Sequence, residues 1–152
     1  MTTQLSENFS LEEFLYSDTA TACGIDNTPS EAIVANLTRL AEVLEEVRRI
    51  LLDQPIHITS GYRCPELNDA CGGAETSAHM SGLAADFTCP EYGTPYDVCI
   101  AIEPYIDVLG IDQLIHESGG GEWTHLGLVA EGQTPRYQCL TINDGGTTEG
   151  FV

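Results

Sequence analysis

A single apolar stripe dominates the hydrophobic pattern in the first third of the chain. Its members recur at steps of three and four residues, the spacing that places side chains on one face of an α-helix: Ile33, Leu37, Leu40, Leu44, Val47 and Leu51. Just before the stripe, Thr28-Pro29-Ser30-Glu31 is a start signal with proline suited to the first helical position. The pattern therefore predicts a long amphipathic helix whose apolar face belongs to the core.

Shorter patterns predict the remaining elements. A capping box at Ser10-Leu11-Glu12-Glu13 opens a short helix through Tyr16, a helical turn starts at Pro65, and Thr94-Pro95-Tyr96-Asp97 caps a helix that runs to about Ile106. Strands are predicted, with a glycine-rich turn between the third and the fourth, at Ile56 to Thr59, Ala84 to Thr88, Gln113 to Glu117, Trp123 to Val129 and Arg136 to Ile142.

The order of these elements, helices first and most strands later, predicts an α+β fold. N-terminal helices are expected to pack on a small antiparallel sheet that carries the functional site. The 152 residues show no linker, so we predict one domain over 1–152. Its core is expected at about 8–142, and the polar, glycine-containing tail 143–152 is expected to be disordered.

The charge of the chain is unusual. It has 24 Asp and Glu residues against five Arg and no Lys, which gives a formal net charge of −19. Such a surface repels phosphate backbones, so we expect no nucleic-acid partner. The apolar stretches are too short to cross a bilayer, and residues 1–10 lack the basic and apolar regions of a secretory signal. We expect a soluble monomer without membrane insertion, suited to a salty medium.

Cysteine spacing leaves the redox state open. The spacings contain no CxxC pair, which argues against a structural zinc finger. Cys64 and Cys71 are seven residues apart, about 10 Å of helical rise, which is too far for a bridge within one straight helix. Both reduced thiols and disulfides remain open for the six cysteines, which are Cys23, Cys64, Cys71, Cys89, Cys99 and Cys139.

Candidate chemistry lies between residues 77 and 86. His79 ends a loop of small and polar residues, Gly82 allows a turn, and Asp86 lies on the strand that follows. The loop can therefore fold back and bring the His79 and Asp86 side chains to one point. His125, on a later strand, would be a third member. Two imidazoles and one carboxylate are a common catalytic zinc set, and they leave the fourth position for water.

The spacing of these residues resembles that of the M15 peptidases, which include zinc D-Ala-D-Ala carboxypeptidases and dipeptidases and phage L-alanyl-D-glutamate endolysins. The resemblance rests first on Ser77-x-His79-x-x-Gly82-x-Ala84-x-Asp86 and on Trp123-x-His125. Further matching segments extend it over most of the chain and favour the small phage-type branch: Asn8 to Phe14, Ser60-Gly61-Tyr62-Arg63, Leu67-Asn68, Gly72-Gly73-Ala74 and Asp112-Gln113-Leu114-Ile115.

The resemblance implies a role for each matching residue. His79, Asp86 and His125 would bind zinc, and Arg63 would contact the substrate or steady the developing oxyanion, its alternative being a structural ion pair. Ser77 would contact substrate or support the metal site, its alternative being simple loop capping. Glu122, three positions before the last histidine, is the first candidate for the general base, and Glu117 at the end of the preceding strand is the second.

The other histidines and the tryptophan are interpreted as structural. His57 is expected to be a packed or surface residue, His116 to belong to its strand, and Trp123 to pack beside the zinc site.

The resemblance implies hydrolysis of a bond in the peptide stems of bacterial peptidoglycan, either D-Ala-D-Ala or L-Ala-D-Glu. The phage-type features and the missing signal favour a phage or prophage endolysin that accumulates in the host cytoplasm and is released through a holin, or a virion-associated wall peptidase. A zinc peptidase acting on other peptides is one alternative. A catalytically inactive phage structural or wall-binding module that keeps the fold is another, although retention of the three ligands argues against it.

Overall fold

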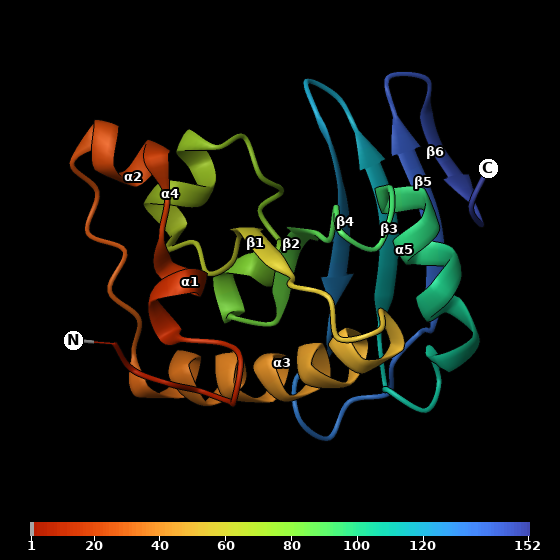
Figure 1. The fold of residues 1–152 in the computed structure, drawn as a ribbon. Helices are drawn as coiled ribbons and strands as arrows, with labels where there is room; N and C mark the ends of the chain where they lie inside the picture. Colours follow the sequence, from red (N-terminus) through yellow and green to blue (C-terminus); the bar gives the residue numbers. More distant parts are fainter. Residues whose placement is uncertain (1) are drawn as a thin grey trace.

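A computed structural model describes residues 2–152 as one α+β domain, with helices packed on a six-stranded sheet (Figure 1). The helices are α1 (Leu11–Leu15), α2 (Asp18–Cys23), α3 (Glu31–Ile50), α4 (Pro65–Ala70) and α5 (Pro95–Ile102), with short 3₁₀ turns η1 (Ala78–Ser81) and η2 (Glu103–Tyr105). The strands are β1 (His57–Ser60), β2 (Ala84–Thr88), β3 (Gln113–Ser118), β4 (Glu122–Gly127), β5 (Gln138–Asn143) and β6 (Gly146–Glu149).

The long helix predicted from the apolar stripe is α3. Ser30 caps its start by accepting a hydrogen bond from the backbone N–H of Ile33, and Arg48 and Arg49 lie in its last turn, where positive charge is favourable. The helix runs beneath the sheet (Figure 1). Its apolar face is fully buried from Leu37 onward and Ile33 is partly buried, so the periodicity identified both the element and its orientation.

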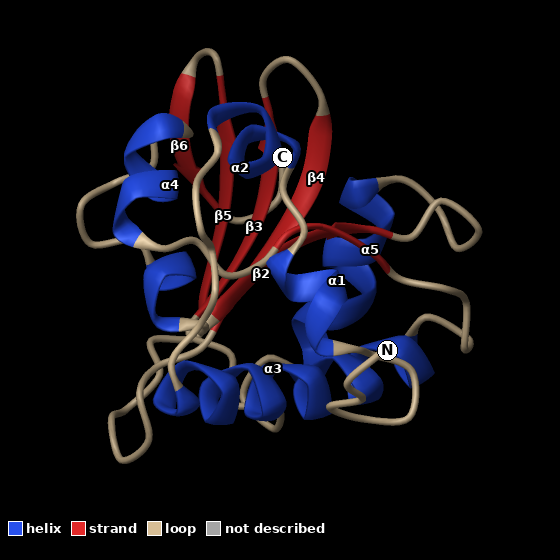
Figure 2. Ribbon diagram, turned by 90° about the vertical axis from the view of Figure 1, so that its left-hand side faces the viewer, coloured by secondary structure: helices blue, strands red, loops and turns tan. Residues whose placement is uncertain are grey.

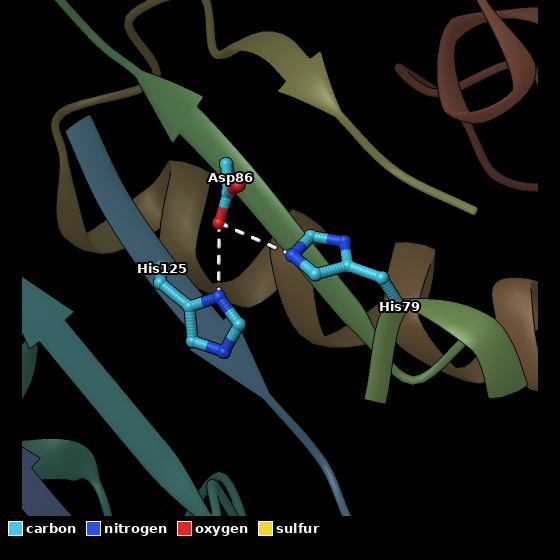
Figure 3. Close-up of side chains that lie close together, drawn as sticks. All are labelled: His79, Asp86 and His125. Atoms are coloured by element: carbon cyan, nitrogen blue, oxygen red, sulfur yellow. Dashed lines mark hydrogen bonds and ion pairs between the residues drawn. The ribbon is translucent and has the colours of Figure 1, made fainter. Parts of the chain in front are cut away.

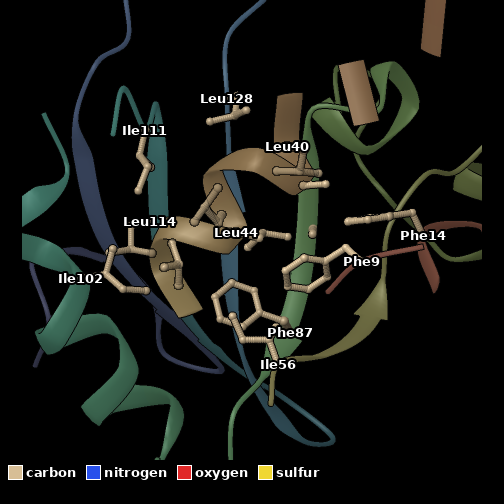
Figure 4. Packing of buried hydrophobic residues seen from close by; sticks show 14 of the residues in the cluster. Phe9, Phe14, Leu40, Leu44, Ile56, Phe87, Ile102, Ile111, Leu114 and Leu128 are labelled. Carbon is tan, nitrogen blue, oxygen red and sulfur yellow. The ribbon is translucent and has the colours of Figure 1, made fainter. Parts of the chain in front are cut away.

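The core lies between this helix, α5 and one face of the sheet (Figure 4). Leu114 of β3, Leu126 of β4 and Phe87 of β2 are fully buried members of it. Successive side chains on a strand point to opposite faces of the sheet. The residues between these apolar positions therefore project from the other face, which the two helices leave open for the functional site.

The sheet differs in one respect from the predicted antiparallel one. Its strand order is β1-β2-β4-β3-β5-β6, and β3 pairs with β5 in parallel, while the other four pairings are antiparallel. The chain between β4 and β5, residues 128–137, crosses back to the start of β3 before β5 begins. Two parallel strands require a connection that returns to the starting edge. The 128–137 loop is that connection, and it also forms one end of the cleft described below.

The C-terminal tail is ordered, so the expectation of disorder was wrong. Residues 146–149 form β6, which pairs antiparallel with β5 at the sheet edge (Figure 2). Asn143 pairs with Gly146 and leaves Asp144-Gly145 as a two-residue loop. An Asp-Gly loop between strands is a strong hairpin signal. The polarity of the tail is explained by its position, since all four β6 residues are exposed.

Helix α2 was missed by the sequence prediction. Its cap is Ser17, whose hydroxyl accepts a hydrogen bond from the backbone N–H of Ala20, and Gly24 ends it in the left-handed conformation. The predicted helix to Ile106 ends earlier, at Ile102, and continues as η2. Within the described part of the chain, no helix has both the length and the apolar character needed to cross a membrane.

All six cysteines are free thiols. Cys99 is fully buried behind the sheet, where its sulfur lies 3.8 Å from the Thr124 hydroxyl. Burial raises the pKa of Cys99 to about 12 and that of Cys139 to about 11, so both side chains stay protonated at neutral pH. These two cysteines therefore act as small apolar residues.

We expect Leu44→Ala to lower the free energy of unfolding by about 2–5 kcal/mol, because Leu44 is fully buried at the centre of the core and its removal leaves a cavity. Val108→Ala is the matched control, since Val108 is 82% exposed and should change stability by less than about 0.5 kcal/mol. Urea denaturation measures both. Equal effects of the two substitutions would contradict the placement of the core.

Candidate functional site

His79, Asp86 and His125 meet on the open face of the sheet (Figure 3). Asp86 on β2 and His125 on β4 are directly opposite each other in an antiparallel pair, which places their side chains on the same face. His79 comes from η1, the 3₁₀ turn that precedes β2. One potential ligand atom from each residue lies within 4.8 Å of the other two. The structure thus brings together the three residues predicted to bind zinc.

One carboxylate oxygen lies close to both imidazoles. Asp86 Oδ1 is 2.9 Å from Nδ1 of His125 and 3.4 Å from Nε2 of His79. The Asp86 side chain is only 10% exposed, and burial by itself would raise its pKa. The adjacent side chains of His125 and His79 outweigh burial and hold the pKa of the Asp86 carboxyl well below its ordinary range. Asp86 is therefore ionised at neutral pH.

A backbone carbonyl determines which nitrogen of His79 faces this carboxylate. Nδ1 of His79 lies 2.7 Å from the carbonyl oxygen of Gly61. A carbonyl can only accept, so Nδ1 donates its proton there, and Nε2 is the nitrogen that faces Asp86, with a lone pair available whenever a metal is bound. Two lone-pair atoms 3.4 Å apart favour a cation between them. Donor atoms around a tetrahedral zinc ion are roughly 3.3 Å apart, so the three side chains fit such an ion.

The carbonyl of Gly61 owes its position to the lack of a side chain there. A Cβ at residue 61 would lie 2.5 Å from the backbone oxygen of Phe14 and 2.7 Å from its Cα. The next residue donates its backbone N–H to that same Phe14 oxygen. Asn27, which is buried, bridges the carbonyls of Leu15 and Tyr62 with its amide nitrogen. The N-terminal segment therefore holds the strand end that orients His79.

Arg63 lies beside the second oxygen of Asp86. Its Nη2 is 3.5 Å from Asp86 Oδ2, its Nε donates to the Ser60 hydroxyl at 3.1 Å, and its Nη1 donates to the Asn68 side-chain oxygen at 3.4 Å. The guanidinium is thus an ion-pair partner of Asp86, which was the structural alternative, and it also lines the cleft. Its substrate-contacting role remains a prediction.

Asn68 was quoted in the sequence pattern without a role, and its environment supplies one. The residue is fully buried, and its amide nitrogen donates to the carbonyl of Ala74 while its oxygen accepts from Arg63. A Cβ on Gly73 would lie 2.1 Å from that oxygen, so glycine is required for the loop to approach. The Leu67-Asn68 and Gly72-Gly73 segments together position Arg63.

Ser77 caps the turn that carries His79. Its hydroxyl accepts a hydrogen bond from the backbone N–H of His79 at 3.2 Å. Capping, one of the two roles considered for this residue, is therefore present. The side chain also lines the cleft, so contact with a substrate stays a prediction.

Glu117 is the acidic side chain that the fold places next to the cluster. It lies on β3 opposite Trp123, and Ile115 of the same strand lies opposite His125, so Glu117 shares the face of His125. Its Oε1 is 3.9 Å from Nδ1 of His125. Burial, and next the negative charge of Asp86, raise the pKa of the Glu117 carboxyl. A raised pKa suits a group that takes up and returns a proton near neutral pH.

Glu122, the first candidate for the general base, lies away from the cluster. Residues 122 and 125 are an odd number of positions apart on one strand, so their side chains leave opposite faces of the sheet. Glu122 Oε1 is 3.2 Å from Nε2 of His116, and its side chain lines a separate hollow near Pro90 and Thr94. Its predicted position beside the metal cluster is therefore wrong.

The remaining aromatic and histidine residues lie as their interpretations expected. His57 is exposed on β1, and His116 lies on the core side of the sheet against Tyr96 and Glu122. Trp123 packs beside Glu117 and lines the cleft.

The cluster opens into a cleft of about 800 Å³. One side of it is formed by the 72–78 loop, and the far end by the loop that leads from β4 to β5. Acidic residues Asp86, Glu117 and Asp112 and two arginines line it. A volume of this size accommodates a short peptide. The arrangement can therefore hold a cation, a peptide segment and a proton acceptor at one place.

Sequence comparison connects this geometry with a known family. A profile of the family described as Peptidase M15 matches residues 7–102, which is more than half of the chain. The chain belongs to the M15 peptidase family. The match includes His79, Asp86 and Arg63 of this M15 peptidase and ends before Glu117 and His125, so the profile does not bear on the latter two. No curated protein matched the chain.

The rim of the cleft carries a pH-sensitive ion pair. Asp112 accepts hydrogen bonds from the backbone N–H of Arg136 at 2.9 Å, from its Nε at 3.0 Å and from its Nη2 at 2.7 Å. The side-chain hydrogen bonds from Arg136, which outweigh burial, lower the pKa of the Asp112 carboxyl. A carboxyl whose pKa is lower in the folded than in the unfolded state stabilises the fold above the unfolded pKa. That contribution is lost as the pH falls through the folded pKa.

We therefore expect Asp112→Asn to lower the free energy of unfolding by about 1–3 kcal/mol at pH 7, because charge-assisted hydrogen bonds are lost. The cost should shrink as the pH falls below about 4, where Asp112 becomes protonated in the unfolded chain first, and should disappear only below the lowered pKa of folded Asp112. Denaturation curves of both proteins at pH 7, 5 and 3 provide the test. A cost that does not change with pH would show that the Asp112 charge does not contribute.

Proposed function

We propose that this M15 peptidase is a zinc enzyme that hydrolyses a bond in the peptide stems of bacterial peptidoglycan. The observation that carries the proposal is the His79–Asp86–His125 cluster at the floor of a cleft that also contains a carboxylate and a guanidinium. Membership of the family supports a metallopeptidase. The stem peptide as substrate is supported by the resemblance of the motifs to wall carboxypeptidases and endolysins.

In the proposed site, Nε2 of His79, Oδ1 of Asp86 and Nδ1 of His125 hold the metal. Zinc bound there would polarise the scissile carbonyl and lower the pKa of water toward about 7. The hydrogen bond from His79 Nδ1 to Gly61 fixes the tautomer that leaves Nε2 free. Arg63, on the opposite oxygen of Asp86, keeps the carboxylate oriented.

Glu117 is the proposed general base. It accepts the proton of the attacking water and delivers it to the leaving amine, and its raised pKa favours both steps near neutral pH. Arg63 donates an N–H to the oxyanion that develops on the scissile carbonyl. Its bonds to Ser60 and Asn68 hold the guanidinium in place before substrate binds. The proposed roles thus use side chains that the fold already orients.

The bond cleaved is proposed to be D-Ala-D-Ala or L-Ala-D-Glu, and the setting a phage or prophage endolysin or a virion-associated wall peptidase. The resemblance to the phage-type branch supports this setting. The acidic composition argues against a nucleic acid as a partner.

Product analysis after digestion of purified peptidoglycan by the zinc-loaded protein tests this proposal. A new free L-alanine carboxyl end identifies an endopeptidase, and released D-alanine identifies a carboxypeptidase. His125→Ala should form neither product, and it should no longer bind zinc stoichiometrically. Wild type that holds zinc without turnover of any stem peptide would instead support an inactive wall-binding module. Cleavage of ordinary L-peptides alone would indicate a peptidase with other substrates.

We expect Glu117→Gln to lower kcat by about a hundredfold or more while zinc content stays stoichiometric, because the amide cannot accept the proton. Glu122→Gln is the matched control. It makes the same chemical change on the opposite face of the sheet and should leave kcat within about twofold of wild type. Steady-state kinetics with a stem peptide and metal analysis of the three proteins provide the comparison. If Glu122→Gln were the inactive variant, the assignment of Glu117 would be wrong.

Activity on whole walls is expected to rise with added salt at low ionic strength. Bacterial walls are often anionic, and a protein with a net charge of −19 is repelled from them until salt screens the charges, with a Debye length of about 10 Å at 0.1 M. A short neutral peptide serves as the control substrate and should show little salt dependence. Wall digestion that slows steadily as salt is added would contradict this expectation.

A further inference from the structure

The five arginines of the chain are unevenly distributed. Three of them, Arg39, Arg48 and Arg49, lie on α3, whereas Arg63 and Arg136 line the cleft. The whole chain has 24 acidic residues for its five arginines, but the cleft has only three acidic residues for its two. The cleft is therefore less acidic than the chain as a whole. Arg63 is paired with Asp86 next to the metal cluster, and Arg136 has no part in that cluster.

Arg136 is held firmly yet leaves one edge of its guanidinium free. Asp112 accepts from its Nε and its Nη2, and Asp112 itself is anchored because its backbone N–H donates to the carbonyl of Gly127. Within residues 2–152, Nη1 of Arg136 has no hydrogen-bond partner. The Arg136 side chain is 59% exposed, while that of Asp112 is 11% exposed. The carboxylate is thus buried behind the guanidinium, and the guanidinium faces the cleft.

We propose that Arg136 binds a carboxylate of the peptide substrate at the end of the cleft remote from the 72–78 loop. The inference rests on the proposed peptidase function and adds a determinant of substrate choice to it. Arginine offers several donors in a fixed plane and suits carboxylate recognition. Because Asp112 already holds the side chain in one conformation, binding a substrate there costs little side-chain entropy.

The sheet sets the distance between this carboxylate and the cleaved bond. Ile115 lies opposite His125, and Asp112 precedes Ile115 by three residues along the same run of chain. At a rise of about 3.3 Å per residue, Asp112 and its partner Arg136 lie roughly 10 Å from the level of the metal cluster. An extended peptide covers that distance with about three residues. The substrate carboxylate is therefore expected two to three residues from the scissile bond.

Peptide stems contain acidic residues and a carboxyl terminus, so such a carboxylate is available in the proposed substrate. The rest of the protein surface repels it, because the net charge is −19. Arg136 would thus distinguish stems with a free carboxylate at this position from stems in which it is amidated. This kind of discrimination is effective, since an unmatched charged group in a partly buried site is costly.

The test uses stem-like peptides whose single distal carboxylate is placed one, two, three or four residues from the cleaved bond, on either side of it. Each is paired with its carboxamide. Wild type is expected to prefer the carboxylate by about tenfold in kcat/KM at two or three residues, mainly through KM, and to show no preference at one or four. A tenfold effect corresponds to about 1.4 kcal/mol. No preference at any position in wild type would overturn the proposal.

Arg136→Ala should remove the preference while cleaving the carboxamides at the wild-type rate within about twofold. Arg136→Ala leaves the buried Asp112 carboxylate without a partner and can therefore be unstable. The double variant Asp112→Asn/Arg136→Ala removes that charge as well, and the same measurement is repeated on it. Arg49→Ala, which removes an exposed arginine of α3, is the matched control and should keep the preference. Equal losses on carboxylate and carboxamide peptides in both cleft variants would show a structural role only and overturn the proposal.

Direct binding separates this inference from the proposed function. Calorimetric titration of the same peptide pairs into wild type and Arg136→Ala requires no turnover. If wild type cleaves none of the peptides, the proposed function fails, yet tighter binding of the carboxylate that disappears in Arg136→Ala would still support the Arg136 site. If cleavage occurs without any effect of Arg136 on binding or preference, the peptidase stands and the Arg136 site is wrong.

Discussion

A buried carboxylate between two imidazoles is the interaction on which the rest of the site depends. Asp86 is ionised in a place where water is largely excluded, and an unpaired charge there would cost several kcal/mol. His125 and His79 approach one oxygen and Arg63 the other, so each carboxylate oxygen has a partner. Those partners are fixed in turn by a backbone carbonyl, a hydroxyl and an amide. The same contacts that stabilise the buried carboxylate also orient three potential metal-binding atoms toward one position.

The fold meets this requirement by giving the two faces of one sheet different tasks. Alternate residues of the central strands face α3 and α5 and are fully buried, which anchors the strands to the core. The residues between them form the floor of the cleft, where Asp86 and His125 face each other across a strand pair and Glu117 lies one strand further. The N-terminal part of the chain contributes at a distance, since Phe14 of α1 and Asn27 of the following loop hold the segment whose carbonyl orients His79. Stability and chemistry are therefore coupled through backbone positions as well as through side chains.

Much of this was visible in the sequence, and the failures have identifiable causes. The spacing from His79 to Asp86, with His125 on a later strand, located the cluster because two of its members are local and the third lies in a recognisable strand. The preference for Glu122 over Glu117 ignored the alternation of side chains along a strand, which alone would have separated residue 122 from residue 125. The sequence prediction missed the C-terminal hairpin because it gave more weight to the polar composition of the tail than to the Asp144-Gly145 turn signal. By contrast, the parallel pairing of β5 with β3 depends on long-range packing that no local pattern encodes. The contact of Asn68 with Arg63 is local in sequence, but it depends on how the loop that contains Ala74 folds against Asn68.

Anomalous scattering at the zinc absorption edge, measured on crystals grown with zinc, tests the central claim most directly. The account predicts one strong peak within bonding distance of His79 Nε2, Asp86 Oδ1 and His125 Nδ1, on the side of the cleft that Glu117 faces. A peak at other residues, or no peak at this cluster in protein with stoichiometric zinc, would contradict it.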